Sequence, residues 1–296
     1  MMSRYNRKIR IVANIVLFTM TLLCVLPLIL LVTSSFTAEE VLAQNGYSFF
    51  PQKWGLDAYL YLWKTRETLL QAYKMTFLVT LIGVSCSLTI TTLFAYGLSK
   101  RSLPGRSVIA FMVFFSMLFN GGLIPSYLMW TQTFHIKDTI FALLLPNLMM
   151  NGFSVIVMRS FFQSSIPEEL LEAAKLDGAG EWKILAWIVL PLSKPILSTI
   201  TLLTGLGYWN DWMNGMYYLV GRTDLFTIQN VLNRMISSMD FLRNSNLTTA
   251  IESGIRTPSI GIRMAIAVIA LIPIVVVYPF LQKGFVKGIV IGSVKG

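Results

Sequence analysis

Long apolar stretches without charge alternate with polar stretches along this chain of 296 residues. A helix needs roughly 20 apolar residues to cross the hydrocarbon core of a membrane. Six stretches reach or approach that length: residues 11–38, 75–99, 107–136, 139–158, 195–210 and 264–282. The fifth is long enough if it begins near Val189 and Lys194 extends to the lipid headgroups. The pattern therefore predicts an all-α integral membrane protein with six transmembrane helices.

The composition agrees with lipid as the solvent. The chain is 55% hydrophobic and 13% charged, whereas about 25% of the residues of a soluble domain are charged. The net charge of +10 would suit a nucleic-acid partner, but the apolar runs favour a membrane, and we expect no nucleic acid. Cys24 and Cys86 both lie in apolar runs, which argues against a disulfide framework. His135 is the single histidine and has no Cys or Asp pair nearby, so no metal site is expected.

The positions of Lys and Arg predict the orientation, because basic residues gather in short cytoplasmic loops. With the N-terminus inside, 14 of the 24 Lys and Arg lie on the cytoplasmic side, in short loops and tails. Both termini are then cytoplasmic. The predicted organisation is a cytoplasmic N-terminus (1–10), a six-helix transmembrane domain (11–283) with an inner loop (159–188) and two outer segments (34–74 and 211–262), and a cytoplasmic C-terminal tail (284–296).

The inner loop has the signals of a short helix. Ser165 followed by Glu168 is a capping-box pattern, and Pro167 is tolerated in a first helical turn. Acidic residues near the start interact favourably with the helix dipole, and Gly178 suits a C-terminal cap. These signals predict a helix over Ile166–Asp177. Its small alanines would permit close approach by another protein surface.

The same loop carries a specific spacing, made up of Glu172, Ala173, Ala174, Gly178, Ile188, Leu190 and Pro191. This spacing resembles the cytoplasmic loop of ATP-binding-cassette (ABC) importer permeases. Residues 166–170 and 177–179 resemble the carbohydrate-uptake, maltose-type branch of that family. Residues 119–125, 209–212 and 284–296 are similar to permeases of complex-oligosaccharide importers, so the resemblance covers nearly the whole chain.

The resemblance implies the six-helix type I ABC importer permease fold. It also implies that this chain forms half of the translocation path for an oligosaccharide, in a bacterial cytoplasmic membrane. The implied partners are a second, different permease subunit, two copies of a cytoplasmic ABC ATPase and an extracellular sugar-binding lipoprotein. In that family the loop helix is the coupling helix, seated in a groove of the ATPase. Glu172, Ala173, Ala174 and Gly178 would form this contact.

The chain lacks the GxxxxGK[ST] loop that cradles nucleotide phosphates. Residues 178–183 are glycine-rich, but they have neither the lysine spacing nor the following Ser or Thr. ATP and Mg²⁺ are therefore expected on the partner ATPase. We expect no cofactor in this chain, no catalytic residue and no enzyme activity of its own.

Candidates for the solute path are polar or aromatic residues within or at the ends of the apolar runs: Asn120, Asn147, Asn151, Trp209, Asn210 and Trp212. Asn147 and Asn151 are one helical turn apart and would face the same way. Gly121 and Gly122, just before Pro125, can break the third span where it lines a cavity. Aromatic faces suit sugar rings, and amides suit hydroxyl groups. The alternatives are helix packing for the asparagines and glycines and an interfacial belt for the tryptophans.

Prolines and the C-terminal tail carry two further expectations. Pro191, Pro195, Pro273 and Pro279 predict bends in the last two spans. The basic, glycine-rich tail either enters the interface between the two ATPases, by resemblance to maltose-type permeases, or lies on anionic lipid.

Three other functions were weighed against this interpretation. An importer of the same class could carry an amino acid, a peptide or a metal instead. A secondary transporter would usually need ionisable residues inside the membrane, and the predicted span cores hold essentially none. A membrane enzyme acting on lipid-linked sugar would need a carboxylate pair or metal ligands, and no such group stands out. The sequence does not indicate which oligosaccharide is carried.

Overall fold

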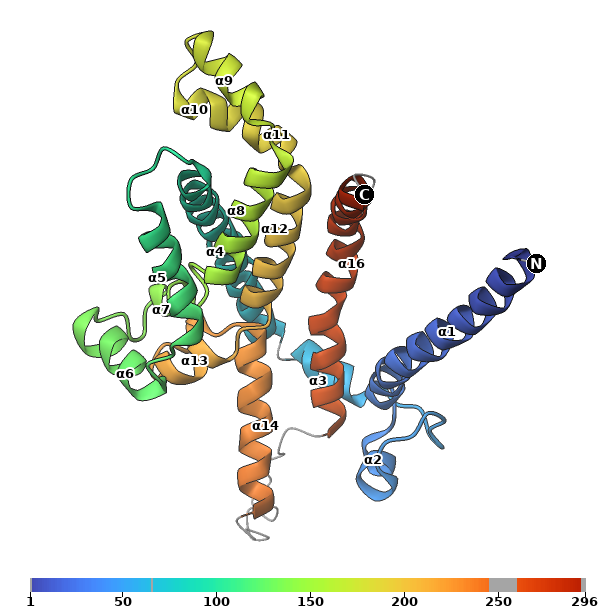
Figure 1. Cartoon of the computed structure of the whole chain (residues 1–296). Coiled ribbons are helices and arrows are strands. Elements are labelled where there is room, and N and C mark those ends of the chain that lie inside the picture. Colours follow the sequence, from blue (N-terminus) through green and yellow to red (C-terminus); the bar gives the residue numbers. More distant parts are fainter. Residues whose placement is uncertain (1, 65, 245–259, 294–296) are drawn as a thin grey trace. The chain divides into compact units, whose positions relative to one another are not determined.

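The computed structural model describes residues 2–64, 66–244 and 260–293. Within them the chain is all-α, as predicted, apart from one isolated antiparallel bridge between Thr37 and Trp54. Figure 1 shows the helices, which are α1 (Met2–Ser35), α2 (Glu39–Asn45), α3 (Asp57–Lys64), α4 (Arg66–Ser99), α5 (Arg106–Leu118), α6 (Leu123–Leu128), α7 (Phe141–Leu144), α8 (Gly152–Ser165), α9 (Glu168–Leu176), α10 (Glu181–Ile184), α11 (Leu190–Leu192), α12 (Lys194–Trp209), α13 (Met213–Tyr218), α14 (Ile228–Asn244) and α16 (Ile260–Ser293). Two π-helical segments, η1 (Met129–Thr133) and η2 (Leu185–Val189), and a 3₁₀ turn, η3 (Thr223–Leu225), complete the described elements.

The predicted apolar runs all contain helix, but several are not straight. By length and composition, Ile9–Ser35 of α1 and the whole of α4 could each cross a membrane unbroken within the described residues. Two bent pairs could each form one more span: α5 with α6 and η1, bent by 113°, and Glu181–Leu192 with Lys194–Tyr218, bent by 82°. The run 139–158 is divided between α7 and α8. The break in the third run and the bend before the fifth were expected from their glycines and prolines, whereas the break in the fourth run was not.

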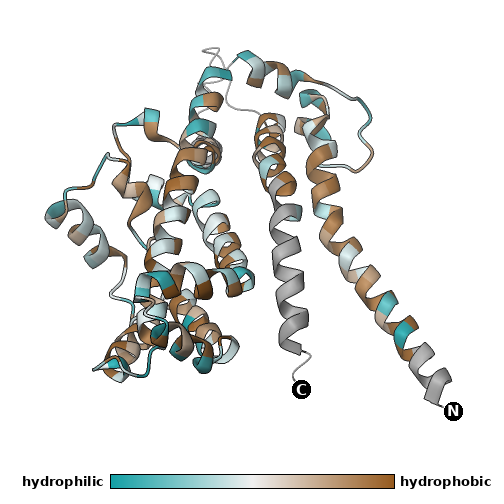
Figure 2. Cartoon of the chain, turned by 90° about the horizontal axis from the view of Figure 1, so that it is seen from above, coloured by the Kyte–Doolittle hydropathy of each residue, from teal (hydrophilic) through white to brown (hydrophobic). Residues whose placement is uncertain are grey.

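The described residues within 1–69 and 232–273 form one compact unit. Its helix α1 is apolar along most of its length (Figure 2). The chain after α1 folds back tightly: the Ser35 and Tyr59 hydroxyls lie 2.9 Å apart, and the Phe36 and Tyr59 rings stack with centroids at 4.7 Å. The Glu39 carboxylate accepts a hydrogen bond from the Gly261 backbone N–H at the start of α16 (3.3 Å). The first part of the predicted outer segment is thus folded structure.

Residues 70–231 and 274–296 form the second unit. A buried apolar cluster joins α4, α5, α8, α10, η2 and α12, and its members include Ala95, Val113, Val155, Met158, Phe162, Ile184, Val189 and Ile200. Between helices in a membrane, such packing is driven by van der Waals contact rather than by removal of apolar surface from water. The cluster holds α8 and α12, between which the inner loop lies, against α4.

The breaks between helices are closed by asparagine side chains and special backbone angles. At the end of α5, Gly122 has a φ of +91°, and the Asn120 side-chain oxygen accepts a hydrogen bond from its N–H (2.9 Å). This is the break that the glycines predicted. Asn151 is the N-cap of α8, and its side-chain oxygen accepts from the Ser154 N–H (3.2 Å). Asn, Asp and Ser are preferred at that position for this reason.

The last two spans respond differently to their prolines. The bend between α11 and α12 falls at Ser193, between Pro191 and Pro195, as predicted. A fifth span that reaches back to Val189 is therefore bent rather than straight. In contrast, α16 continues without a break through Pro273 and Pro279 to Ser293. The predicted tail 284–296 is therefore helical over its described part, and residues 294–296 lie outside the described residues.

Asp138 holds the loop before α7 to the loop after α13. It is one of three non-glycine residues with positive φ among the described residues, with His135 and Asn147. These residue types tolerate the left-handed region better than others. One Asp138 carboxylate oxygen accepts hydrogen bonds from the N–H groups of Val220 (2.7 Å), Gly221 and Arg222. The Val220 bond, followed by the other two, lowers the pKa of Asp138, because all three favour the charged form.

Replacement of Asp138 by Asn tests this fastening. The folded pKa lies below the ordinary value of about 3.9, so the contribution is complete above that value and is lost as pH falls through the folded pKa. We expect Asp138→Asn to lower the thermal unfolding midpoint in detergent by roughly 2 °C at pH 7. The difference from the wild type should shrink below about pH 4. A difference that is equal at pH 7 and pH 3 would contradict the role of the charge.

Candidate functional site

The inner loop begins at the end of α8 and contains the helix α9 and the short helix α10. These two helices lie beyond the ends of α8 and α12 (Figure 1). The helix α9 spans Glu168–Leu176 and is shorter than predicted. Ser165 belongs to the last turn of α8, and Ile166 is extended (φ −107°, ψ 115°). A residue before proline avoids the helical region because the proline ring clashes with it. The helix therefore begins after Pro167, and the predicted capping box does not form.

The C-terminal end of α9 is closed as the sequence predicted. Gly178 has a φ of +77°. Its N–H donates to the Lys175 carbonyl (3.0 Å), and the Ala179 N–H donates to the Ala174 carbonyl (2.9 Å). These two bonds define the Schellman motif, which satisfies carbonyls that a helix end leaves free. A Cβ at Gly178 would meet no atom within 4 Å, so the constraint at this position is the backbone conformation alone.

The four predicted coupling residues do not share one surface. Ala174, together with Leu171 and Ala179, packs against the buried cluster of the second unit. Glu172, Ala173 and Gly178 are exposed. The helix α9 thus has an inner side that anchors it and an outer side that is available to a partner. Leu176, at the end of the helix, has a side chain that is 89% exposed.

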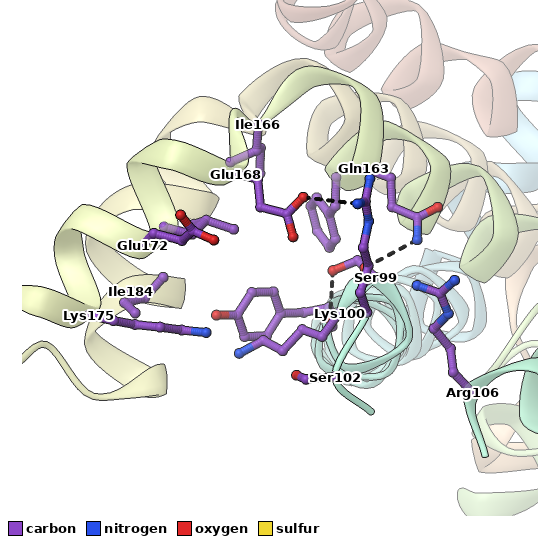
Figure 3. Close-up of a pocket in the computed structure, with 14 residues that line it drawn as sticks. Ser99, Lys100, Ser102, Arg106, Gln163, Ile166, Glu168, Glu172, Lys175 and Ile184 are labelled. Atoms are coloured by element: carbon purple, nitrogen blue, oxygen red, sulfur yellow. Dashed lines mark hydrogen bonds and ion pairs between the residues drawn. The ribbon is translucent and has the colours of Figure 1, made fainter. Parts of the chain in front are cut away.

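A polar pocket of about 520 Å³ lies between α9 and the end of α4. Figure 3 shows Lys100 and Lys175 extended toward one another across it. The Arg101 guanidinium lies 3.5 Å from the Glu168 carboxylate, and the Gln163 side-chain amide donates to the Ser99 carbonyl (3.1 Å). Partial burial lowers the pKa of Lys100, and the nearby Lys175 lowers it further. The pocket therefore holds basic groups from both sides close together.

Glu181, the first residue of α10, brings these groups together. Its carboxylate accepts a hydrogen bond from the Tyr96 hydroxyl (2.8 Å) and forms an ion pair with Lys100. The Lys175 ammonium lies 3.8 Å from its other oxygen. In the sequence, Glu181 stands out only as part of a glycine-rich turn. Its position next to the end of α4, 85 residues earlier, left no signal in the local sequence.

A second cavity, of about 170 Å³, collects two of the predicted path residues. Asn147 and Asn151 line it together with Ser154 and, from α12, Thr204 and Gly207. The predicted reason was wrong, since residues 145–151 do not form a helix. They meet because the chain turns at Asn147, which has a φ of +61°. The remaining lining is apolar and consists of Leu148, Phe153 and Leu203.

The other predicted path residues lie outside that cavity. The Trp209 side chain is 7% exposed and packs edge-on against Phe77, with ring centroids 5.2 Å apart. The Asn210 side chain accepts a hydrogen bond from Gln229 (3.2 Å), and the Trp212 carbonyl accepts one from Asn230. The Asn120 side-chain oxygen accepts a hydrogen bond from the Gly122 N–H at the break after α5. Direct contact of these residues with solute stays a prediction, and for Trp209 burial favours a packing role.

The uncharged cavity offers two kinds of contact. Amide and hydroxyl groups exchange hydrogen bonds with hydroxyl groups, and apolar side chains can cover C–H surfaces. Polar residues inside an apolar run would have indicated Ser154 and Thr204, but the sequence analysis did not select them. The cavity can bind a polar, uncharged group, and no side chain in it carries a charge.

The comparisons with known proteins agree with this geometry. Residues 1–291 match the family described as binding-protein-dependent transport system inner membrane component. The chain is 39% identical over 274 residues to protein LplC of Bacillus subtilis, covering 92% of this chain and 90% of that protein. It is 38% identical over 280 residues to the polygalacturonan/rhamnogalacturonan transport system permease protein YtcP of the same organism, covering 95% of this chain and 96% of the other.

A solved structure gives the fold independently. A bacterial ABC transporter involved in the import of the acidic polysaccharide alginate has a chain that superposes with a TM-score of 0.78 at 30% identity, covering 95% of this chain and 97% of that one. The predicted type I permease fold is therefore confirmed. The chain belongs to the family of inner-membrane components of binding-protein-dependent transport systems and is a permease subunit of an ABC importer.

Proposed function

We propose that this chain and a second, different permease subunit form the path for an oligosaccharide through the cytoplasmic membrane. An extracellular sugar-binding lipoprotein delivers the oligosaccharide, and two copies of a cytoplasmic ATPase drive its passage. The ATPase binds ATP and Mg²⁺, while this chain binds no cofactor. The helix α9 seats in a groove of one ATPase copy, and both termini lie in the cytoplasm.

The construction of α9 is the observation that carries the coupling role. Leu171 and Ala174 hold one side of the helix to the core, while Glu172 and Ala173 remain exposed on the other. The small Ala173 side chain permits close approach, and the Schellman turn at Gly178 ends the helix sharply. A helix with an anchored side and a free side can be pushed by a partner without detaching from its own chain.

Two further observations support an oligosaccharide as cargo. One relative is named for polygalacturonan and rhamnogalacturonan transport, and the similar solved structure is described as importing alginate. The cavity lined by Asn147, Asn151 and Thr204 offers hydrogen-bonding groups beside apolar side chains. Fragments of acidic polysaccharides are therefore the first substrates to test, with a neutral oligosaccharide such as maltotriose for comparison.

Cysteine labelling tests the orientation. In a chain whose Cys24 and Cys86 are replaced by serine, Leu176→Cys should resist a membrane-impermeant maleimide in intact cells, because α9 faces the cytoplasm. Val220→Cys, next to the Asp138 fastening, should react. Both positions are exposed, at 89% and 62%, so access within the protein does not decide the result. Labelling of Leu176→Cys in intact cells would overturn the topology.

A pair of substitutions on α9 tests the coupling surface. Ala173→Arg should abolish co-purification of the ATPase, or uncouple ATP hydrolysis from uptake, because it places a bulky charge in a packed interface, where overpacking costs about 1–3 kcal/mol. Ala174→Arg should instead destabilise the permease itself, because Ala174 faces its own core. ATPase pull-down and the thermal midpoint of the permease separate the two effects.

Leu176→Arg, at the exposed end of α9, is the comparison for these two variants. It should leave the thermal midpoint unchanged and reduce ATPase binding less than Ala173→Arg. If Ala173→Arg binds the ATPase and supports uptake normally, α9 is not the coupling element and the proposed role fails.

The cavity is tested by removing one hydroxyl. Thr204→Val preserves side-chain shape, and loss of one hydrogen bond of about 1 kcal/mol should raise the KM for uptake about fivefold. Thr201→Val, on the same helix but outside the lining of the cavity, is the matched control and should leave KM unchanged. The measurement is uptake of labelled oligogalacturonides by proteoliposomes containing the assembled importer. Equal KM values for the two variants would remove Thr204 from the path.

A further inference from the structure

Glu181 joins three helices that are separate in the sequence. It begins α10, its carboxylate receives the Tyr96 hydroxyl and the Lys100 ammonium from the end of α4, and Lys175 approaches it from α9. Each contact involves a charged group, and hydrogen bonds to charged groups are stronger than neutral ones. The junction therefore connects the candidate coupling helix to α4.

Aromatic packing shields this junction from water. The Lys100 ammonium lies 4.3 Å from the centroid of the Tyr96 ring, in cation–π geometry. The Tyr96 ring in turn packs edge-on against Phe162 of α8, with centroids 6.4 Å apart. Both aromatic side chains are buried, and the Lys100 side chain is only 21% exposed, while the Glu181 side chain is 52% exposed. The pair is therefore shielded on its lysine side, and salt screens it less than a fully exposed pair.

A second ion pair in the same pocket provides a contrast. Arg101 and Glu168 also connect the chain after α4 to α9, at 3.5 Å. The two glutamates are similarly exposed, at 54% for Glu168 and 52% for Glu181, but the Arg101 side chain is 80% exposed against 21% for Lys100. Exposed pairs such as Arg101–Glu168 contribute little. Figure 3 shows Lys100 and Glu168 lining the same pocket. The structure thus supplies a matched control within one pocket.

The connection matters because of how the loop is attached. The chain itself links α9 to α8 on one side and to α10 and α12 on the other. The end of α4 has no such covalent link to the loop, so displacement of α9 can reach α4 only through side-chain and backbone contacts. Glu181 supplies two of these contacts, to Tyr96 and Lys100, and its third contact, to Lys175, ties it to α9. The Gln163 bond to the Ser99 carbonyl supplies another.

We propose that Glu181 is a positioning residue that makes the coupling loop and the cytoplasmic end of α4 move as one body during the transport cycle. This inference rests on the proposed function, because it assumes that the ATPase displaces α9. Without Glu181, the ATPase would still dock and would still move α8 and α12. The end of α4 would no longer follow, so ATP would be hydrolysed with little solute moved.

The functional test compares three variants in the complete importer. Glu181→Gln keeps the size of the side chain and removes its charge; uptake of labelled oligogalacturonides per ATP hydrolysed should fall about tenfold, with ATPase co-purification unchanged. Tyr96→Phe removes only the hydroxyl and should give a smaller loss in the same direction. In the double variant the losses should be less than additive, since both act through one junction. Arg101→Gln, the control, removes the exposed Arg101–Glu168 pair without changing α9 and should stay near the wild-type value.

The physical test needs no sugar. Spin labels are attached at Ser102→Cys, after α4, and Lys183→Cys, in α10, in a chain lacking Cys24 and Cys86. The distance distribution between them is measured by electron paramagnetic resonance in the assembled importer, without nucleotide and after trapping with ATP and vanadate. In the parent the distribution should be the same in both states. With Glu181→Gln it should broaden or shift between them.

The outcomes separate this inference from the function on which it rests. If the parent distribution already shifts between the two states, or if Glu181→Gln leaves both the distribution and the coupling ratio unchanged, Glu181 is not the link. If Ala173→Arg also leaves ATPase binding and uptake intact, the proposed coupling role fails as well. Loss of function in Glu181→Gln together with loss of ATPase binding would likewise overturn the inference, because it would indicate misfolding of the loop.

Discussion

A backbone N–H or C=O group inside a membrane has no water to replace a lost helical hydrogen bond. This constraint governs the second unit, several of whose helices are interrupted. At three of the interruptions a side chain takes over, whereas the bend at Ser193 has no side-chain cap. Asn120 closes the break after α5, Asn151 caps α8, and the Asp211 carboxylate accepts from the Met213 and Asn214 N–H groups before α13. The helices can be broken at these places because short polar side chains accept hydrogen bonds from the backbone N–H groups that the breaks leave free.

The same logic fixes the walls of the small cavity. Before the turn at Asn147, the Leu144 carbonyl accepts the Tyr208 hydroxyl (2.8 Å), and the Pro146 carbonyl accepts the Asn214 side-chain amide (3.1 Å). Tyr208 can reach its partner because Gly83 of α4 lacks a Cβ, which would lie 2.4 Å from the tyrosine ring. The irregular segment is therefore held from two sides, and this leaves Asn147 to line the cavity.

The sequence predicted what depends on composition and local spacing. Apolar runs gave the all-α membrane fold, the glycines at 121–122 gave a break, and Gly178 gave the end of α9. It did not predict features that depend on residues far apart in the chain. Pro146 and Asn151 were available signals for the break in the fourth run, but Tyr208 and Asn214, which hold it, come more than 60 residues later.

The errors on the coupling loop have the same origin. Pro167 alone could have moved the start of α9, because the residue before a proline is driven out of the helical region. Helical spacing put Ala174 on a surface for a partner, yet spacing cannot say which face the rest of the chain covers. The buried cluster built from α4, α8 and α12 covers the face of α9 that carries Ala174. Glu181 shows the limit most clearly, since its partner Tyr96 belongs to a different span.

Together these features separate a stiff part of the second unit from an adaptable one. The loop is fixed by a buried cluster, a Schellman turn and a shielded charge junction, as an element that transmits a push must be. The cavity is built on a helix break, where a few residues can absorb a change of backbone angle while the flanking helices stay intact. A rigid loop at one end and an adaptable wall at the other would suit the proposed transport of solute driven through α9. Both depend on the placement of a few asparagines and glycines and of one glutamate in the loop.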